Sequence, residues 1–178
     1  EVIDGLNLAL EKGLSIAVVA SGGKLLETAK EKTLPYIELP IGHQPRMTIG
    51  FQIKALAKLL GRQDVLDEAR GLTERLNPSE FEEMGKMLAE KLSGKIPVIY
   101  ASEANRALAY IWKAKFHETA KIPAFYNVFP EVNHNEMIGF DAQSQVFHFL
   151  LLADQQDHLR IKRRMEVFAK LFGERGFP

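Results

Sequence analysis

The segment FPEVNHNEMIGF, residues 129–140, sets charged and amide side chains between apolar neighbours. Its carboxylates are Glu131 and Glu136, and its imidazole is His134. A carboxylate that follows a strand and lies among apolar groups can be tuned to act as a general base near neutral pH. The alternative is a polar turn in which an asparagine closes the turn and Glu136 starts a helix. The spacing leaves both interpretations open.

His134, Asn135 and Glu136 match the H-x-E pattern of zinc deaminases, which complete their metal shell with cysteines. The chain has no cysteine. The other histidines show neither HExxH nor another metal-binding spacing; they are His43, His117, His148 and His158. We therefore expect neither a metal ion nor another cofactor.

Two turns in the first half of the chain could hold an anion. In SGGK, which begins at Ser21, backbone amides at a helix start could receive a phosphate, although paired glycines also occur there for steric reasons alone. In GHQPR, Gln44 and Arg46 lie between a strand and a helix, near the edge where open α/β sheets bind ligands. Arg46 could hold a phosphate or stabilise an oxyanion, or it could be an ordinary surface arginine.

His158 begins the last helix, directly after an apolar strand. The helix dipole disfavours an imidazolium there, which suits a group that exchanges protons near neutral pH. A solvated histidine at a helix end is the alternative. His148 lies within the apolar run VFHFLLLA, and we interpret it as a core or sheet-face histidine with its hydrogen bonds satisfied.

Composition favours small polar ligands and protein partners over nucleic acid or membranes. The chain of 178 residues has 23 basic and 23 acidic side chains, so no net charge attracts it to a polyanion. Its longest apolar run is far shorter than the roughly 20 residues that span a bilayer. The absence of cysteine fits a reducing compartment, so we expect a cytoplasmic protein.

Apolar runs of strand length alternate with amphipathic helical segments along the chain. This order is typical of βαβ units in a parallel sheet covered by helices, so the sequence predicts an α/β fold. The predicted strands are 14–21, 35–40, 96–102, 123–129 and 145–154. The predicted helices are 1–13, 25–32, 47–61, 104–121, about 157–173, and one that follows a capping sequence at Asn77 and stops at Gly94.

The segment GRQDVLDEARGLTERLN is charged and helix-prone, with few strand formers. We interpret it as a helical connector over residues 62–76. The sequence then predicts an α/β unit over residues 1–61 and a second one over 77–178.

Taken in order, IPVIYAS, ALAYIWKAKFHETAKIPAF, FPEVNHNEMIGF and DHLRIKRRMEVFAKLF resemble the bifunctional phosphoglucose/phosphomannose isomerases, and so do IAVVASGGKLLETAK and LPIGHQPRMTIGF in the first half. The resemblance covers nearly the whole chain, and PExNHNE with GxQPR is its most specific part. It implies two sugar-isomerase (SIS) domains, each a three-layer αβα sandwich with a parallel sheet. It also implies that the first domain is incomplete and that the second lacks its C-terminal end.

The same resemblance implies aldose–ketose isomerisation of a hexose 6-phosphate. Glu136 corresponds to the base that carries a proton between C2 and C1, with Glu131 as the rival assignment. Arg46 corresponds to the group that stabilises the enediolate, and His158 to the group that opens the sugar ring. Ser21, Gln44 and His134 are expected to bind substrate.

The family's histidine comes from a partner subunit, so the resemblance implies a homodimer. The family's phosphate-binding SxSGNTxE loop and its C-terminal lysine have no match here, which implies that this polypeptide by itself is inactive. The preference between glucose and mannose stays open. A non-catalytic SIS module that senses a phosphosugar, and the isomerase part of an amidotransferase, are the alternative functions.

Overall fold

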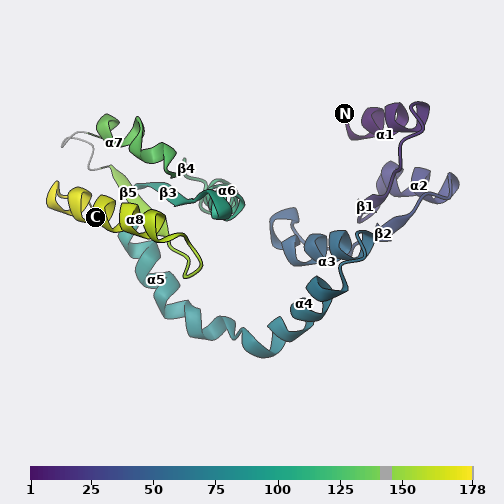
Figure 1. Ribbon diagram of the computed structural model, residues 1–178. Helices are drawn as coiled ribbons and strands as arrows, with labels where there is room; N and C mark the ends of the chain where they lie inside the picture. The colour runs from purple at the N-terminus through teal and green to yellow at the C-terminus, as the bar shows by residue number, and fades with distance from the viewer. Residues whose placement is uncertain (141–145, 178) are drawn as a thin grey trace. The chain divides into compact units, whose positions relative to one another are not determined.

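The computed structural model describes residues 1–140 and 146–177 (Figure 1). It divides into two compact units, Glu1–Pro78 and Ser79–Pro178. Within the described residues, no helix is both long enough and apolar enough to cross a membrane.

The first unit is built around a small βαβ arrangement. Strands β1 and β2 pair in parallel, with Val18 opposite Tyr36. The helices and strands of this unit are α1 (Val2–Glu11), β1 (Val18–Ala20), α2 (Gly23–Glu31), β2 (Tyr36–Glu38), α3 (Ile49–Leu59) and α4 (Gln63–Arg75), with a 3₁₀ turn at Pro45–Met47 before α3.

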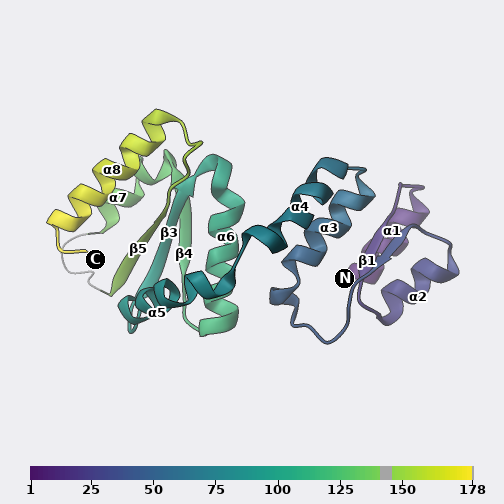
Figure 2. The same ribbon diagram turned by 90° about the horizontal axis from the view of Figure 1, so that it is seen from below.

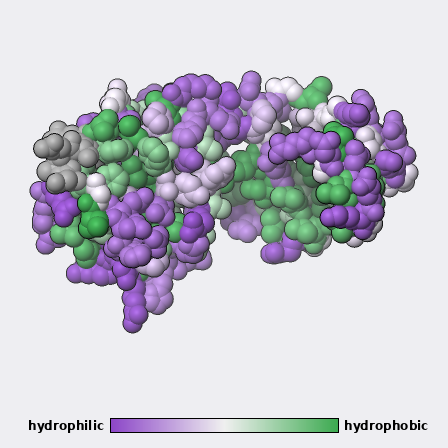
Figure 3. All heavy atoms as spheres, turned by 90° about the horizontal axis from the view of Figure 1, so that it is seen from above, coloured by the Kyte–Doolittle hydropathy of each residue, from purple (hydrophilic) through white to green (hydrophobic). Residues whose placement is uncertain are grey.

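Every element of the first unit has at least one boundary that differs from the sequence prediction, and two differences have a clear local cause. The strand expected over 14–21 is only three residues long, because its ladder partner β2 is equally short. The helix expected from residue 47 begins at Ile49, because Pro45 starts a 3₁₀ turn ahead of it. Exposed apolar residues recur at helical spacing along α3 and its C-cap, at Ile49, Ile53, Leu56 and Leu60. Figure 3 shows hydrophobic side chains gathered over this helix.

The second unit contains a three-stranded parallel sheet in the order β4-β3-β5. Its helices and strands are α5 (Glu82–Lys91), β3 (Ile96–Ser102), α6 (Arg106–Lys115), β4 (Phe125–Phe129), α7 (Glu136–Gly139), β5 (Phe147–Leu152) and α8 (Leu159–Glu174). Shorter turns lie between them: 3₁₀ turns at Pro78–Phe81, Glu103–Asn105 and Glu131–Asn133, and a π turn at Phe116–Ala120.

Helices cover both faces of this sheet. Helices α7 and α8 lie on one face and α6 lies on the other (Figure 2). On the α8 face, Tyr100 packs with an aromatic cluster that includes Phe129, Phe168 and Phe172. On the α6 face, Ile99 and Ala101 pack against Ala109. Successive residues of β3 thus point into different cores, as a strand between two helical layers requires.

Two predictions for the second unit need correction, and part of a third lies outside the described residues. The helix expected after Asn77 begins at Glu82, because the proline of that capping sequence starts a 3₁₀ turn instead. The helix expected to run to residue 121 leaves α geometry after Lys115. The first residue of the last predicted strand, 145, lies outside the described residues.

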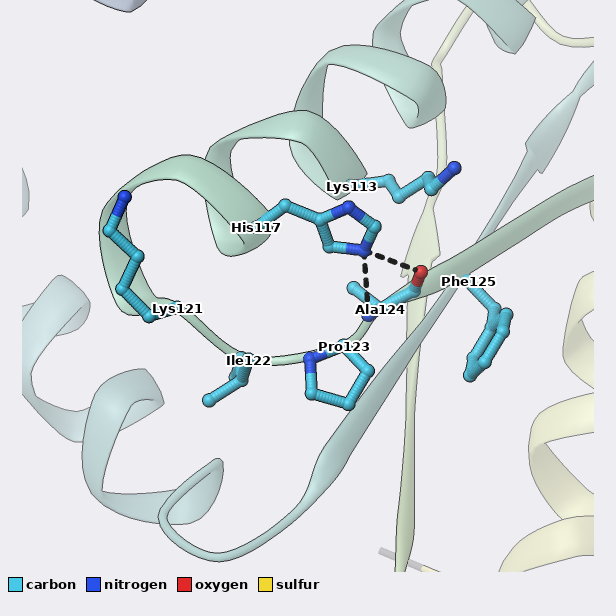
Figure 4. Close-up of a pocket in the computed structure, with 7 residues that line it drawn as sticks. All are labelled: Lys113, His117, Lys121, Ile122, Pro123, Ala124 and Phe125. Atoms are coloured by element: carbon cyan, nitrogen blue, oxygen red, sulfur yellow. Dashed lines mark hydrogen bonds between the residues drawn. The ribbon is translucent and has the colours of Figure 1, made fainter.

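The π turn is anchored by the side chain of His117, which contacts the backbone of Ala124. The ring nitrogen Nε2 of His117 lies 3.0 Å from the backbone N of Ala124 and 3.1 Å from its carbonyl oxygen. These contacts fasten the end of the helical segment to the chain that enters β4 (Figure 4). The altered helical turn therefore coincides with a specific side-chain anchor.

Candidate active site

The carboxyl ends of β3 and β5 meet in a polar network. The side-chain nitrogen Nδ2 of Asn105 lies 3.1 Å from Ser102 Oγ, 3.2 Å from Asp154 Oδ2 and 3.5 Å from Asp157 Oδ1. Asp157 is buried, and its Oδ2 accepts from the backbone N of Asp154 at 3.1 Å. The pKa of Asp154 is lowered, first by the backbone N–H of Gln156 and then by Asn105. The network fixes the loop that leads into α8.

His158 directly follows this network and caps α8. Its Nδ1 accepts from the backbone N of Arg160 at 3.1 Å. A neutral imidazole whose Nδ1 accepts must carry its proton on Nε2. The ring is exposed, so it presents an Nε2–H donor at the carboxyl edge of the sheet.

Glu136 is the first residue of α7 and is half-buried. Its Oε2 accepts from Asn127 Nδ2 at 3.2 Å. The amide oxygen of Asn127 accepts from the backbone N of Val128 at 2.8 Å, which fixes which end of the amide faces Glu136. The carboxylate therefore has a defined orientation over β4.

Tyr100 lies beside this pair and was not identified from the sequence. It is the register partner of Asn127 across β3 and β4. Burial, followed by the negative charge of Glu136, raises the pKa of Tyr100 well above its usual range. The sequence did not indicate Tyr100 as a candidate site residue because it lies within an apolar predicted strand. The one feature that could have indicated it was a phenolic hydroxyl in a segment predicted to be buried.

Glu131 and His134 lie together on the surface. The Oε1 atom of Glu131 is 3.4 Å from His134 Nδ1 and accepts from Asn135 Nδ2 at 3.1 Å. Both members of the Glu131–His134 pair are exposed, whereas Glu136 is half-buried. The two acidic residues of the motif thus have different surroundings.

The candidate residues of the first unit follow its two strands. Ser21 comes directly after β1, and Gln44 and Arg46 lie on the segment after β2. Ser21 and Gln44 are exposed, and Arg46 is half-buried. The convergence of these residues with Glu136 stays a prediction from the sequence.

Two cavities flank the sheet of the second unit at opposite ends. One, of about 440 Å³, lies beside the end of β5 and is lined by Asp154, Lys162 and Met165 among others. The other, of about 430 Å³, lies at the amino end of β4 and includes His117 and Phe125 (Figure 4). The first adjoins the network before His158. Among the described residues, no cluster of three or more His, Cys, Asp or Glu side chains is placed to hold a metal ion.

A parallel sheet covered by helices on both faces, with polar groups after its strands, defines an α/β domain, an architecture in which ligands commonly bind at the carboxyl edge of the sheet. Residues 81–178 match the family described as the bacterial phosphoglucose isomerase C-terminal SIS domain. The chain belongs to this family.

Individual relatives agree with that assignment. The bifunctional phosphoglucose/phosphomannose isomerase of Aquifex aeolicus is 33% identical over 180 residues, covering 99% of this chain and 56% of the relative. The D-glucosamine-6-phosphate 4-epimerase of Sulfolobus acidocaldarius is 32% identical over 168 residues, covering 88% and 53%. The chain thus spans about half the length of these relatives.

A solved structure supports the fold. It is that of a candidate phosphosugar isomerase from Clostridium difficile 630, which superposes with a TM-score of 0.57 at 21% sequence identity. The match covers 92% of this chain and 51% of the other. At this identity the similarity concerns architecture alone.

Proposed function

We propose that the protein catalyses aldose–ketose isomerisation of hexose 6-phosphates, converting glucose 6-phosphate and mannose 6-phosphate to fructose 6-phosphate. One observation carries the proposal. In a chain of the phosphoglucose isomerase family, Glu136 of the NHNE motif is half-buried and is oriented by a side-chain amide. An oriented carboxylate is what proton transfer between neighbouring carbons requires.

In the proposed mechanism, Glu136 removes the proton from C2 of the open-chain sugar and returns it to C1 through a cis-enediol. Arg46 supplies fixed positive charge where the enediolate oxygen develops. His158 assists ring opening, with its Nε2–H placed to donate a hydrogen bond to the ring oxygen. Ser21, Gln44 and His134 bind the substrate.

The proposal includes the assembly and the domain plan. Residues 1–61 form part of one SIS domain, residues 62–76 connect the two domains, and residues 77–178 belong to the second domain. The active site is shared within a homodimer, in which His158 acts in the site of the neighbouring subunit.

Replacing Glu136 by glutamine tests the proposal in the full-length protein. The Glu136→Gln substitution keeps the acceptor for Asn127 but removes the base, so we expect kcat to fall by about 10²–10⁴-fold. Phosphosugar binding, measured by calorimetry, should stay close to that of the parent. A coupled assay with glucose 6-phosphate and mannose 6-phosphate measures the isomerisation.

Glu131→Gln is the matched control, because Glu131 is exposed and binds His134 and Asn135. If Glu131→Gln abolishes turnover and Glu136→Gln does not, the base is Glu131. If the parent binds hexose 6-phosphates without isomerising them, the protein is a phosphosugar sensor. A parent that instead epimerises glucosamine 6-phosphate would replace the proposed reaction with that of the Sulfolobus relative.

A further inference from the structure

Within the described residues, no hydrogen bond of good distance and angle reaches the hydroxyl of Tyr100, although a weaker hydrogen bond to Glu136 contributes to its raised pKa. The side chain is completely buried. Buried polar atoms in native proteins nearly always have a partner, so this hydroxyl requires an explanation.

The ring of Tyr100 cannot easily turn to find a partner elsewhere. It packs against Phe129, Phe149 and Phe168, with ring centroids 6.0, 5.7 and 5.3 Å away. These contacts come from β4, β5 and α8. A partner for the hydroxyl must therefore move to it.

The acidic group beside Tyr100 is Glu136. Its negative charge acts on the phenol and, together with burial, keeps the pKa of Tyr100 far above neutrality. Tyr100 therefore retains its proton and is available as a donor. Glu136 lies on α7, a helix of only four residues, which makes it the more adjustable of the two groups.

Asn127 already fixes one side of the same carboxylate. Tyr100 and Asn127 are opposite each other in the β3–β4 ladder, so both side chains leave the same face of the sheet. Asn127 donates to Oε2 of Glu136, and its own oxygen is held by the backbone of Val128. The two strands thus present two donors to one acidic group.

We propose that Tyr100 is a positioning residue for Glu136, and that its hydroxyl donates to the Glu136 carboxylate when that carboxylate is aimed at the substrate. This inference rests on the proposed role of Glu136 as the base. With two donors from neighbouring strands, the carboxylate is held against rotation while the proton moves between C2 and C1. Orientation of this kind can determine rate strongly, because small displacements of a reacting group are costly.

Other charged groups near the pair are engaged with one another. Glu131, on the 3₁₀ turn before α7, contacts His134, which directly follows that turn. Arg164 of α8 donates to Asn133. The remaining contacts of Tyr100 that the structure describes are aromatic, so Tyr100 and Glu136 form the ionisable pair on this part of the sheet.

Tyr100→Phe in the full-length protein tests the inference, because phenylalanine keeps the ring packing and removes only the hydroxyl. We expect kcat for fructose 6-phosphate formation to fall about 10- to 100-fold. KM should stay within about twofold, because the completely buried side chain of Tyr100 is not available to bind the substrate directly. The acidic limb of the kcat profile should move to higher pH, since a carboxylate that loses a donor accepts a proton more readily.

Tyr126→Phe is the matched control, because Tyr126 neighbours Asn127 on β4 but packs on the α6 face. It should keep the parent kcat and pH profile. An unchanged kcat and profile in Tyr100→Phe, alongside an inactive Glu136→Gln, would overturn the positioning role and leave the proposed function intact. Full activity in Glu136→Gln would overturn the proposed base itself, and with it this inference.

Discussion

Arg164 of α8 donates to Oδ1 of Asn133 at 3.0 Å, joining residues 31 positions apart in the chain. Asn133 belongs to the NHNE motif, and α8 is the helix that His158 caps. This bond ties the loop that precedes Glu136 to the helix that carries the proposed ring-opening histidine. The relative placement of these two segments within one unit therefore has a specific polar support.

Substitutions of His158 should distinguish its role as the N-cap of α8 from its proposed role in proton transfer. Asparagine is a good N-cap residue, so His158→Asn should keep the stability of α8, whereas His158→Ala should lose about 0.5–2 kcal/mol of unfolding free energy. Both variants should lose turnover by about 10²–10⁴-fold if the imidazole transfers protons. Urea unfolding followed by Trp112 fluorescence and a coupled kinetic assay measure the two properties. Parent-like turnover in His158→Asn would assign the residue to capping alone.

Asn105 should be a stabilising residue of the carboxyl edge. Its side-chain amide nitrogen donates hydrogen bonds to the side chains of Ser102, Asp154 and Asp157. Asn105→Ala leaves a buried carboxylate with fewer donors, so we expect the free energy of unfolding to fall by about 1–3 kcal/mol.

Urea unfolding checks this value, with Gln156→Ala as the control from the same loop. The side chain of Gln156 is exposed, so this control should change stability by less than about 0.5 kcal/mol. Equal effects of the two substitutions would show that the network contributes nothing specific.

The free energy of unfolding of the second unit should decrease as the pH falls near 6. Burial, followed by the charges of Lys91 and Lys95, lowers the pKa of His148 from its usual value of 6.5. The folded state therefore binds a proton at His148 less readily than the unfolded state does. The contribution of neutral His148 to the free energy of unfolding is fully present above about pH 6.5. This contribution is lost as the pH falls from about 6.5 through the pKa of His148 in the folded state.

Urea midpoints at pH 7.5 and 5.5 measure this decline, and His148→Leu should reduce it. A ring titration by NMR locates the midpoint for His148 directly. A midpoint at or above 6.5 would contradict the expected direction. The structure confirms that His148 is buried, but it corrects the expectation that all its hydrogen bonds are satisfied, since Nδ1 has no partner among the described residues.

The architecture of the second unit could be predicted because its signals are local. The apolar run IPVIYAS became β3 with both predicted ends, since a central strand pairs along its full length. In the first unit, the run at 14–21 was equally apolar, but a strand ends where its partner ends. Strand length there depended on a second segment that periodicity cannot measure.

The candidate site could be predicted only as far as its sequence motif. Glu136 and Glu131 are equivalent in residue type and nearly so in position, and only the fold gives them different neighbours. The Asn127–Glu136 bond depends on how α7 lies over β4, and Tyr100 enters through its register with Asn127. Such relations arise from strand register and packing, which composition and spacing do not encode visibly.

The aromatic cluster under α8 has an evolutionary consequence. Phe168 of α8 and Tyr100 of β3 share that cluster, so the helix that His158 caps and the face that supports Glu136 rest on common packing. A homologue that exchanges one large ring for a smaller side chain would keep its architecture yet shift Glu136 in its own proposed site and His158 in the proposed site of the partner subunit. Divergence in turnover among relatives can therefore originate in residues that never contact a sugar.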